Sequence, residues 1–218
     1  MDARLIIIDD HPLFRSGVSH LVDMDPDLAL VGEASDGDEG IALAARTNPD
    51  LILLDLHMKG RSGLETLRAL RDSGCDARII ILTVSDNPDD IVAAIRAGAD
   101  GYLLKDMDPL QLIGHIREAL LGRKVIDLEL NALLARALRN DGERESRRPD
   151  LLTEREKTIL RCLANGMSNK LIARTLNITE GTVKVHIKNL LKKLEFHSRL
   201  EAAVWAVEQG LRDCITTE

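Results

Sequence analysis

Short apolar runs alternate with helix-like segments throughout the first 123 residues, and this alternation limits the possible folds more than any other feature of the chain. Five runs have the length and apolar character of strands, the second being the weakest: 5–8, 28–31, 51–54, 79–82 and 102–104. Segments with helical periodicity follow each of them, near 12–22, 37–46, 63–72, 88–97 and 109–121. Strands that are apolar on both faces belong to a parallel sheet covered by helices. Because crossovers between parallel strands are right-handed, we predict a doubly wound, flavodoxin-like α/β domain with the strand order 2-1-3-4-5.

The rest of the chain has a different pattern, which predicts a second domain. Residues 127–138 have helical periodicity, and the stretch RNDGERESRRPD that follows is polar and lacks large apolar residues, as expected of a linker. An ordered surface loop within a single domain is the alternative. Four helical segments come next: 153–164, 168–175, 179–194 and 198–209. We therefore predict an α/β domain at 1–123, a linker helix and flexible tether at 124–149, and an all-α four-helix domain at 150–218.

Charge is divided unevenly between the two predicted domains. The whole chain has a net charge of −7. Residues 1–123 carry 12 Lys and Arg against 22 Asp and Glu, whereas residues 150–218 carry 11 against 9. The acidic excess therefore lies in the first domain and does not exclude a nucleic-acid partner for the second. Aromatic residues make up only 2% of the chain, too few for the base-stacking surface of a single-strand binder.

Other classes of protein are disfavoured by what the sequence lacks. No stretch approaches the roughly 18 consecutive apolar residues of a membrane span. The N-terminus runs directly into the first predicted strand without the organisation of a signal peptide, so we expect a cytoplasmic protein. The three cysteines lie far apart, and neither CxxC nor HExxH occurs, which argues against a disulfide or a metal–thiolate site.

Acidic residues follow two strands that the predicted topology places side by side. Asp9 and Asp10 come after the first strand, and Asp55 comes after the third. Ligands bind at the carboxyl ends of such neighbouring strands, where the strand order reverses. Clustered carboxylates repel one another, and Mg²⁺ with its preference for oxygen ligands relieves that repulsion. Thr83 and Lys105 end the fourth and fifth strands, so the pocket combines a carboxylate nucleophile, a metal site, a hydroxyl and a cation, as phosphoryl transfer requires.

The segments around these residues closely resemble the receiver domains of two-component response regulators. The resemblance covers residues 4–121 and is carried by IIIDDHPLFRSGV, DLILLDLHMKGRSGLETL, ILTVSD and GADGYLLKD. It implies that Asp55 is the phosphoacceptor, and that Mg²⁺ is bound by Asp9, Asp10, Asp55 and the backbone carbonyl of His57.

The same resemblance assigns three further roles in the pocket. Thr83 would bind the phosphoryl group, Lys105 would form an ion pair with it, and Tyr102 would be the aromatic switch residue. His11 directly follows the acidic pair and is a candidate base or metal ligand. Because Pro12 comes next, at the first turn of the predicted helix, we instead expect His11 to line the loop that opens this helix.

The third helix of the second domain has the layout of a DNA-recognition helix. Ser168 and Thr179 are N-cap candidates about one helix apart, so a short helix and a turn at Asn177 precede residues 179–194. Apolar residues at helical spacing predict a buried face, and lysines recur every four residues on another. The residues expected to contact DNA are Lys184, Val185, Lys188, Lys192 and Thr182. A solvated lysine stripe is the alternative, which the helix-turn-helix context disfavours.

Residues 151–208 closely resemble the LuxR/FixJ-type helix-turn-helix, through the stretch from LTEREKTIL to LLKKL and the following SRLEAAVWAV. The resemblance implies a homodimer on operator DNA through helix 198–209. By resemblance to the nitrate-responsive branch of this family, Lys184, Val185 and Lys188 lie at the positions that read DNA bases. Within this family the chain is most similar to nitrate/nitrite regulators. This resemblance implies a DNA-binding transcription regulator and not an enzyme. It also implies phosphorylation by a sensor histidine kinase and control of anaerobic respiration genes.

Three alternative functions follow from the same residues. One is a regulator of the same family that responds to a different signal. A second is a Mg²⁺-dependent phosphatase with an aspartyl-phosphate intermediate, which would usually need a second Asp where this chain has His57. A third is a phosphorylation-gated protein-interaction module without DNA affinity, which the lysine spacing disfavours.

Overall fold

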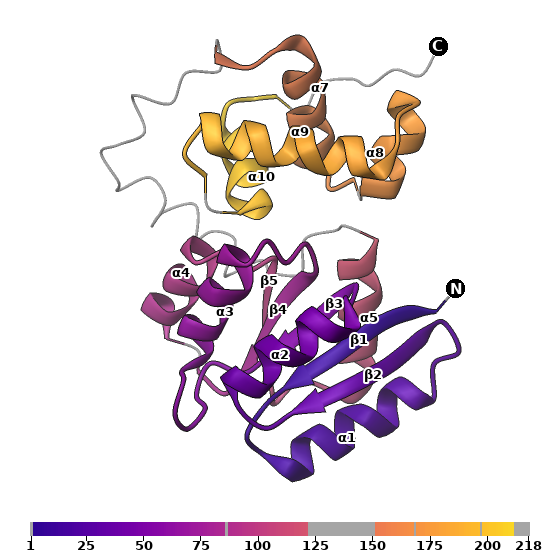
Figure 1. The fold of residues 1–218 in the computed structure, drawn as a ribbon, viewed down its shortest axis with the longest axis vertical. Coiled ribbons are helices and arrows are strands. Elements are labelled where there is room, and N and C mark those ends of the chain that lie inside the picture. Colours follow the sequence, from indigo (N-terminus) through magenta and orange to yellow (C-terminus); the bar gives the residue numbers. More distant parts are fainter. Residues whose placement is uncertain (1, 86, 122–150, 168, 197, 212–218) are drawn as a thin grey trace.

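The computed structural model describes residues 2–85, 87–121, 151–167, 169–196 and 198–211 (Figure 1). The predicted linker helix at 127–138 and the polar tether after it lie outside the described residues. None of the helices in the described ranges is long and apolar enough to cross a membrane.

Five parallel strands form the sheet of the first domain, in the order β2-β1-β3-β4-β5 that the sequence predicts. The strands are β1 (Ala3–Ile8), β2 (Leu28–Ala34), β3 (Leu51–Leu54), β4 (Arg78–Thr83) and β5 (Gly101–Leu104). β2 extends three residues beyond its predicted end, because its pairing with β1 continues through the polar Glu33 to Ala34. Ile8 pairs with Leu54, so the acidic residues that follow β1 and β3 emerge at one edge of the sheet.

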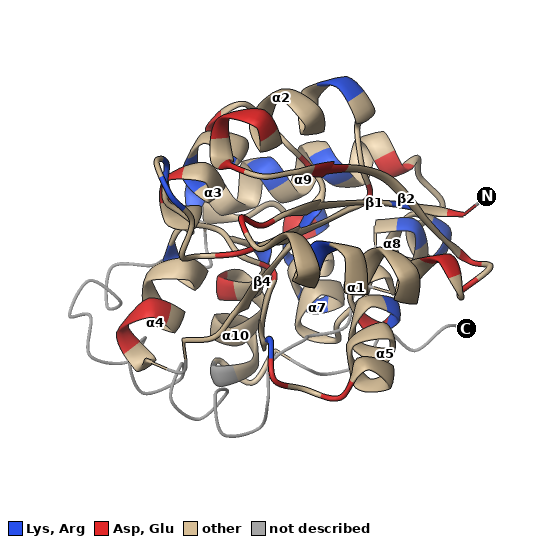
Figure 2. Cartoon of the chain, turned by 90° about the horizontal axis from the view of Figure 1, so that it is seen from below, with Lys and Arg blue, Asp and Glu red and all other residues tan. Residues whose placement is uncertain are grey.

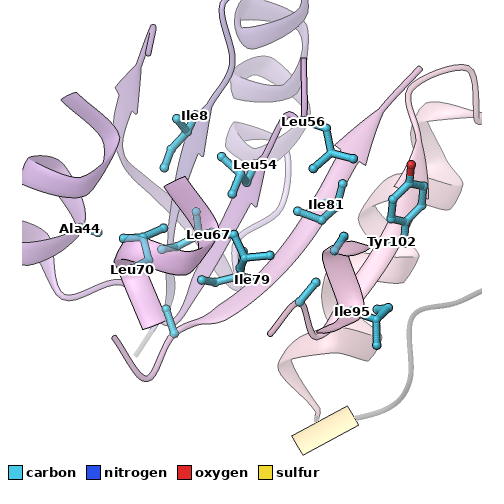
Figure 3. Close-up of a cluster of buried hydrophobic side chains, with 14 of the residues drawn as sticks. Ile8, Ala44, Leu54, Leu56, Leu67, Leu70, Ile79, Ile81, Ile95 and Tyr102 are labelled. Carbon is cyan, nitrogen blue, oxygen red and sulfur yellow. The ribbon is translucent and has the colours of Figure 1, made fainter. Parts of the chain in front are cut away.

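Helices cover both faces of this sheet and bury its apolar side chains in two clusters. The helices are α1 (Pro12–Asp23), α2 (Gly37–Thr47), α3 (Gly63–Asp72), α4 (Pro88–Arg96) and α5 (Pro109–Leu120). On one face, residues such as Ile79 and Ile81 pack with Leu67 of α3 and Ile95 of α4 (Figure 3). On the other face, α1 and α5 pack against the alternate residues of the strands. Burial on both faces explains why the strands are continuously apolar.

In the described part of the second domain the chain forms the four predicted helices: α7 (Glu154–Ala164), α8 (Asn169–Leu176), α9 (Glu180–Lys193) and α10 (Arg199–Glu208). Thr153 and Glu156 form the predicted capping box at the start of α7. Between α8 and α9, Asn177 has a φ of 51°, in the left-handed region that Asn tolerates better than most residues. This residue closes α8 and allows the tight turn into α9.

The second domain contacts the first through α10, which lies against α4 (Figure 1). Leu200 and Val204 of α10 are buried in the same apolar cluster as Ile91 and Ile95 of α4. A second contact joins Lys184 of α9 to Asp76 of the first domain, with 3.1 Å between Nζ and Oδ2. The two domains therefore share an apolar contact and a polar contact.

Candidate functional site

The ends of β1 and β3 bring the predicted carboxylates together. The backbone N–H of Asp55 donates to the carbonyl of Ile8, and that of Asp9 donates to the carbonyl of Ala34. These bonds continue the sheet pairing and fix both side chains at its edge. The side chains of Asp9 and Asp55 are each only 2% exposed, whereas that of Asp10 is 18% exposed at the mouth of the pocket.

Lys105 lies at the centre of the pocket and neutralises part of its charge. Its Nζ is 2.6 Å from Oδ2 of Asp55 and 2.7 Å from Oδ2 of Asp9. The backbone N–H of Lys105 donates to the carbonyl of Thr83, which places the lysine at the end of β5 as predicted. Its ammonium also lies 4.9 Å from the ring centre of Phe14, within the range of a cation–π contact. Phe14 was not a predicted site residue, because its proximity depends on how α1 packs.

The donor set of the pocket fits a divalent cation. Three carboxylates and one ammonium leave a net charge of −2, which a divalent ion would balance. One ligand atom from each of Asp9, Asp10, His11 and Asp55 lies within 4.8 Å of the others. Oδ1 of Asp10 is buried and accepts no hydrogen bond from the part of the chain that the structure describes. A buried carboxylate oxygen without a partner is costly, and a bound cation would satisfy it.

The side chains of Thr83 and His57 contact each other, while the backbone of His57 contacts the nucleophile. Thr83 is fully buried, and its Oγ1 is 3.2 Å from Nδ1 of His57. The backbone N–H of His57 donates to Oδ1 of Asp55, 3.3 Å away, which places this backbone beside the carboxylate. The carbonyl of His57 stays a predicted metal ligand. The contact of the His57 ring with Thr83 was not predicted, since sequence spacing does not fix the direction of a side chain.

Tyr102 is buried and is joined to the loop after β4. Its hydroxyl donates to the backbone carbonyl of Ser85 over 2.8 Å. Ser85 in turn donates from its backbone N–H to Oγ1 of Thr83, and from its hydroxyl to Oδ2 of Asp90 in α4. Thr83, Tyr102 and α4 are thus connected through one serine, which the sequence analysis did not identify.

Gly63 is a structural requirement of the pocket that sequence reasoning also missed. It begins α3, and a Cβ atom at this position would lie 1.9 Å from the backbone carbonyl oxygen of Asp55. Any larger residue would therefore displace the backbone that carries the nucleophile. The glycine within the RSGLETL segment was the available signal, although a glycine alone does not reveal close approach.

The predicted recognition helix has the two faces expected of it. Val183, Ile187 and Leu190 of α9 are buried against the rest of its domain. The side chains predicted to contact DNA are exposed, except Thr182, which is half-buried: Lys184, Val185, Lys188, Lys192 and Thr182. Thr179 caps the helix by accepting from the backbone N–H of Thr182. Figure 2 shows the basic residues of α8 and α9 in blue and the acidic residues of α2 and α4 in red.

Lys193 differs from its neighbour Lys192 in a way that the lysine pattern does not reveal. Its Nζ is 2.7 Å from Oε2 of Glu156, a residue that is 3% exposed and also forms the α7 capping box. Burial raises the pKa of Glu156, but its bonds to Lys193 and Thr153 outweigh burial and lower the pKa below its usual range. Lys193 therefore holds α9 against α7.

The fold, the acidic pocket and the helix-turn-helix define a two-domain regulator of transcription. Residues 5–117 match the response regulator receiver domains, and residues 150–206 match the LuxR family of bacterial regulatory proteins. The chain therefore belongs to the two-component response regulators with a LuxR-type DNA-binding domain. Members of this family are DNA-binding transcription regulators rather than enzymes in the usual sense.

Among curated proteins, the chain is similar to two Escherichia coli K12 nitrate/nitrite response regulators. It is 49% identical to NarL over 209 residues, which covers 96% of this chain and 97% of that protein. It is 51% identical to NarP over 206 residues, which covers 94% of this chain and 95% of that protein. Among solved structures, the chain is similar to the response regulator ChrA of a heme-sensing two-component system. The sequence identity is 34% and the TM-score is 0.51, and the match covers 96% of this chain and 98% of that one. A LuxR-family regulator from Aurantimonas, also 34% identical, has a TM-score of 0.58 over 63% of this chain and 98% of that one.

Proposed function

We propose that a sensor histidine kinase phosphorylates this response regulator on Asp55, and that the phosphorylated form controls nitrate- and nitrite-responsive genes of anaerobic respiration. The observation that carries the proposal is the pairing of a buried Asp55 with Lys105 in an acidic pocket that fits a divalent cation. The similarity to NarL and NarP supports nitrate or nitrite as the signal. Because the proposed regulator receives its phosphoryl group from a sensor kinase and binds DNA, we infer that it acts in the cytoplasm.

The phosphoryl transfer is a displacement at phosphorus. A carboxylate oxygen of Asp55 attacks the phosphorus of the kinase phosphohistidine, a P–O bond forms, and the P–N bond breaks. The released imidazole keeps the electron pair and takes a proton from solvent. Lys105 remains within reach of the new phosphoryl oxygens, because its Nζ already contacts Asp55. Fixed charges of this kind stabilise the transferring group without reorganising during the reaction.

The pocket residues would hold Mg²⁺ beside the nucleophile. Asp9, Asp10, Asp55 and the backbone carbonyl of His57 would bind it. The ion supplies charge neutralisation for the anionic phosphoryl oxygens. Asp9 also orients Lys105 through the 2.7 Å contact, so Asp9 interacts with the lysine ammonium as well as with Mg²⁺.

Phosphorylation would reach the second domain through Thr83. A phosphoryl group on Asp55 offers oxygen acceptors that compete with His57 for the Thr83 hydroxyl. Ser85 connects Thr83 to Tyr102 and to Asp90 of α4, so a shift of Thr83 changes the position of α4. Since α10 packs on α4, this shift weakens the contact between the domains. The result is a change of population between two arrangements, closed and open.

Opening would release two surfaces that DNA binding needs. The apolar face of α10 that contacts the receiver belongs to helix 198–209, which in this family forms the homodimer. Lys184, which contacts Asp76 in this structure, becomes able to reach a base edge together with Lys188. Val185 would contact a thymine methyl group, while Thr182 and Lys192 would contact the DNA beside these positions.

The proposal is tested by the genomic binding sites of the chain in its host, measured with and without nitrate. We expect nitrate to increase occupancy at a defined set of promoters, and Asp55→Asn to remove the increase. An increase with a different signal would overturn nitrate as the input and leave the family intact. Rapid turnover of generic phosphomonoesters by the purified chain would instead favour the phosphatase alternative.

A further inference from the structure

The imidazole of His11 faces the acidic pocket. Its Nδ1 is 3.0 Å from Oδ1 of Asp10, 3.3 Å from Oδ1 of Asp9 and 3.9 Å from Oδ2 of Asp55. His11 is the N-cap residue of α1, but its side chain makes no capping hydrogen bond with this helix, all of which is described. The expected role in opening the helix therefore does not account for the direction of the ring.

The contact between His11 and Asp10 is short but is not a hydrogen bond. Oδ1 of Asp10 has no hydrogen-bond partner among the described residues, although Nδ1 of His11 lies 3.0 Å away. Two ligands of the same metal ion have this relation, because each is directed at the ion and not at the other. With metal–ligand distances of about 2.1 Å in an octahedral site, adjacent ligand atoms lie about 3.0 Å apart and opposite ones about 4.2 Å apart. The distance from Nδ1 to Asp10 equals the first value, and the distances to Asp9 (3.3 Å) and Asp55 (3.9 Å) lie between the two.

We propose that Nδ1 of His11 is a ligand of the divalent metal in the phosphorylation pocket. The proposal rests on the metal site of the proposed function and adds an imidazole nitrogen to its oxygen ligands. Imidazole favours borderline metals such as Ni²⁺, Co²⁺ and Zn²⁺ over Mg²⁺, and divalent affinities rise from Mn²⁺ towards Cu²⁺. The pocket of this chain should therefore bind Ni²⁺ and Co²⁺ more tightly than an all-oxygen pocket would.

A protonated His11 that forms ion pairs with Asp9 and Asp10 is the competing explanation. It makes the opposite prediction, because an imidazolium repels a metal ion and its removal would strengthen metal binding. The sign of the change on substitution thus separates a ligand from a counter-ion. Lys105 already provides one cation in the pocket, and the charge of −2 that remains beside it matches a divalent ion rather than a single imidazolium.

The test is the affinity of the full-length chain for Mg²⁺ and Ni²⁺ by isothermal titration calorimetry. The variants are His11→Ala and His11→Asn, whose amide retains an oxygen donor, with His20→Ala as the exposed control. We expect His11→Ala to weaken Ni²⁺ binding by about tenfold to a hundredfold and Mg²⁺ binding by less than about threefold. His11→Asn should restore Mg²⁺ affinity fully and Ni²⁺ affinity only in part, and His20→Ala should match the unchanged chain.

A spectroscopic readout tests the bond directly. In the Co²⁺-loaded chain, ligation shifts the ring protons of His11 far outside the normal proton NMR range, and His11→Ala should remove that signal. Unchanged Ni²⁺ affinity in His11→Ala, or tighter binding of either metal, would overturn the proposal. Asp10→Ala tests the metal site separately, because undiminished binding of Mg²⁺ in this variant would contradict the site itself and not only the role of His11.

Discussion

In the receiver pocket, Asp9 and Asp55 are each 2% exposed and share one lysine partner. On α9, by contrast, Val185 is 58% exposed, and Lys188 and Lys192 are also exposed. The pocket is preorganised, since its charges are fixed by contacts within the protein. The α9 surface is less so: Lys184 and Lys193 have acidic partners within the protein, but Val185, Lys188 and Lys192 are exposed and are expected to gain their partners on DNA. Buried charges interact strongly and exposed ones weakly. Substitutions should therefore have large effects in the receiver and small effects on the exposed surfaces.

The largest effect is expected at the nucleophile. Asp55→Asn should reduce phosphorylation by acetyl phosphate or by the kinase below detection, because an amide does not attack phosphorus. The fold should survive, since Lys105 keeps its 2.7 Å contact with Asp9. Phosphate-affinity electrophoresis measures the labelling and circular dichroism measures the fold. Labelling of the variant at the normal rate would show that Asp55 is not the acceptor.

A second buried carboxylate tests the comparison through stability. Asp100 is 7% exposed and binds Arg71 at 2.6 Å and Arg78 at 3.3 Å. Asp100→Asn removes the counter-ion of Arg71 and Arg78 and of the nearby Arg199 of α10, so we expect the free energy of unfolding to fall by about 3–5 kcal/mol. The matched control is Asp38→Asn, whose partner Arg61 lies at the surface, with an expected loss of about 0–1 kcal/mol. Urea denaturation gives both values, and equal losses would contradict the distinction.

The same residue gives a pH dependence. Burial raises the pKa of Asp100, but the charges of Arg71 and Arg78 outweigh burial and hold the pKa below its usual range. A lowered folded-state pKa means that the stabilisation is complete above the unfolded value of about 3.9 and is lost as the pH falls through the folded value. The difference in unfolding free energy between the wild type and Asp100→Asn should therefore be constant from neutral pH down to about 3.9 and should narrow at lower pH. A difference that did not narrow at acid pH would contradict the pKa assignment.

The receiver was predicted more completely than the contacts of the second domain, and the reason is physical. Strand ends lie at fixed positions in a parallel sheet, so Asp9, Asp55 and Thr83 could be placed from the strand pattern alone. Side-chain contacts between distant segments have no such rule. The pairs Lys193–Glu156 and Lys184–Asp76, together with the direction of the His11 ring, depend on packing that periodicity does not describe.

An intermediate effect is expected where an exposed lysine acquires a partner on DNA. Lys188→Ala should weaken binding to the operator by about 1–3 kcal/mol, because a base-edge hydrogen bond is lost. Lys192→Ala should weaken operator and scrambled DNA about equally, and should reduce the salt dependence by about one phosphate contact. Fluorescence anisotropy over a salt series measures both. Equal losses on the two duplexes for Lys188→Ala would make it a phosphate contact and not a base-reading residue.

The smallest effect is expected at the polar contact between the domains. Lys184 and Asp76 form an ion pair whose side chains are 45% and 61% exposed, and such pairs contribute about 0.2–1 kcal/mol. Asp76→Asn should therefore increase operator binding by the unphosphorylated chain by less than about fivefold, because Lys184 is released while Leu200 and Val204 still pack on α4. In the proposed mechanism phosphorylation opens this contact in either protein, so we expect the phosphorylated forms to bind equally. Anisotropy with and without acetyl phosphate measures the four affinities, and Asp72→Asn is a nearby acidic control. If Asp76→Asn raised the affinity of both forms alike, its effect would be a general loss of repulsion from DNA, and the ion pair would have no part in keeping the domains closed.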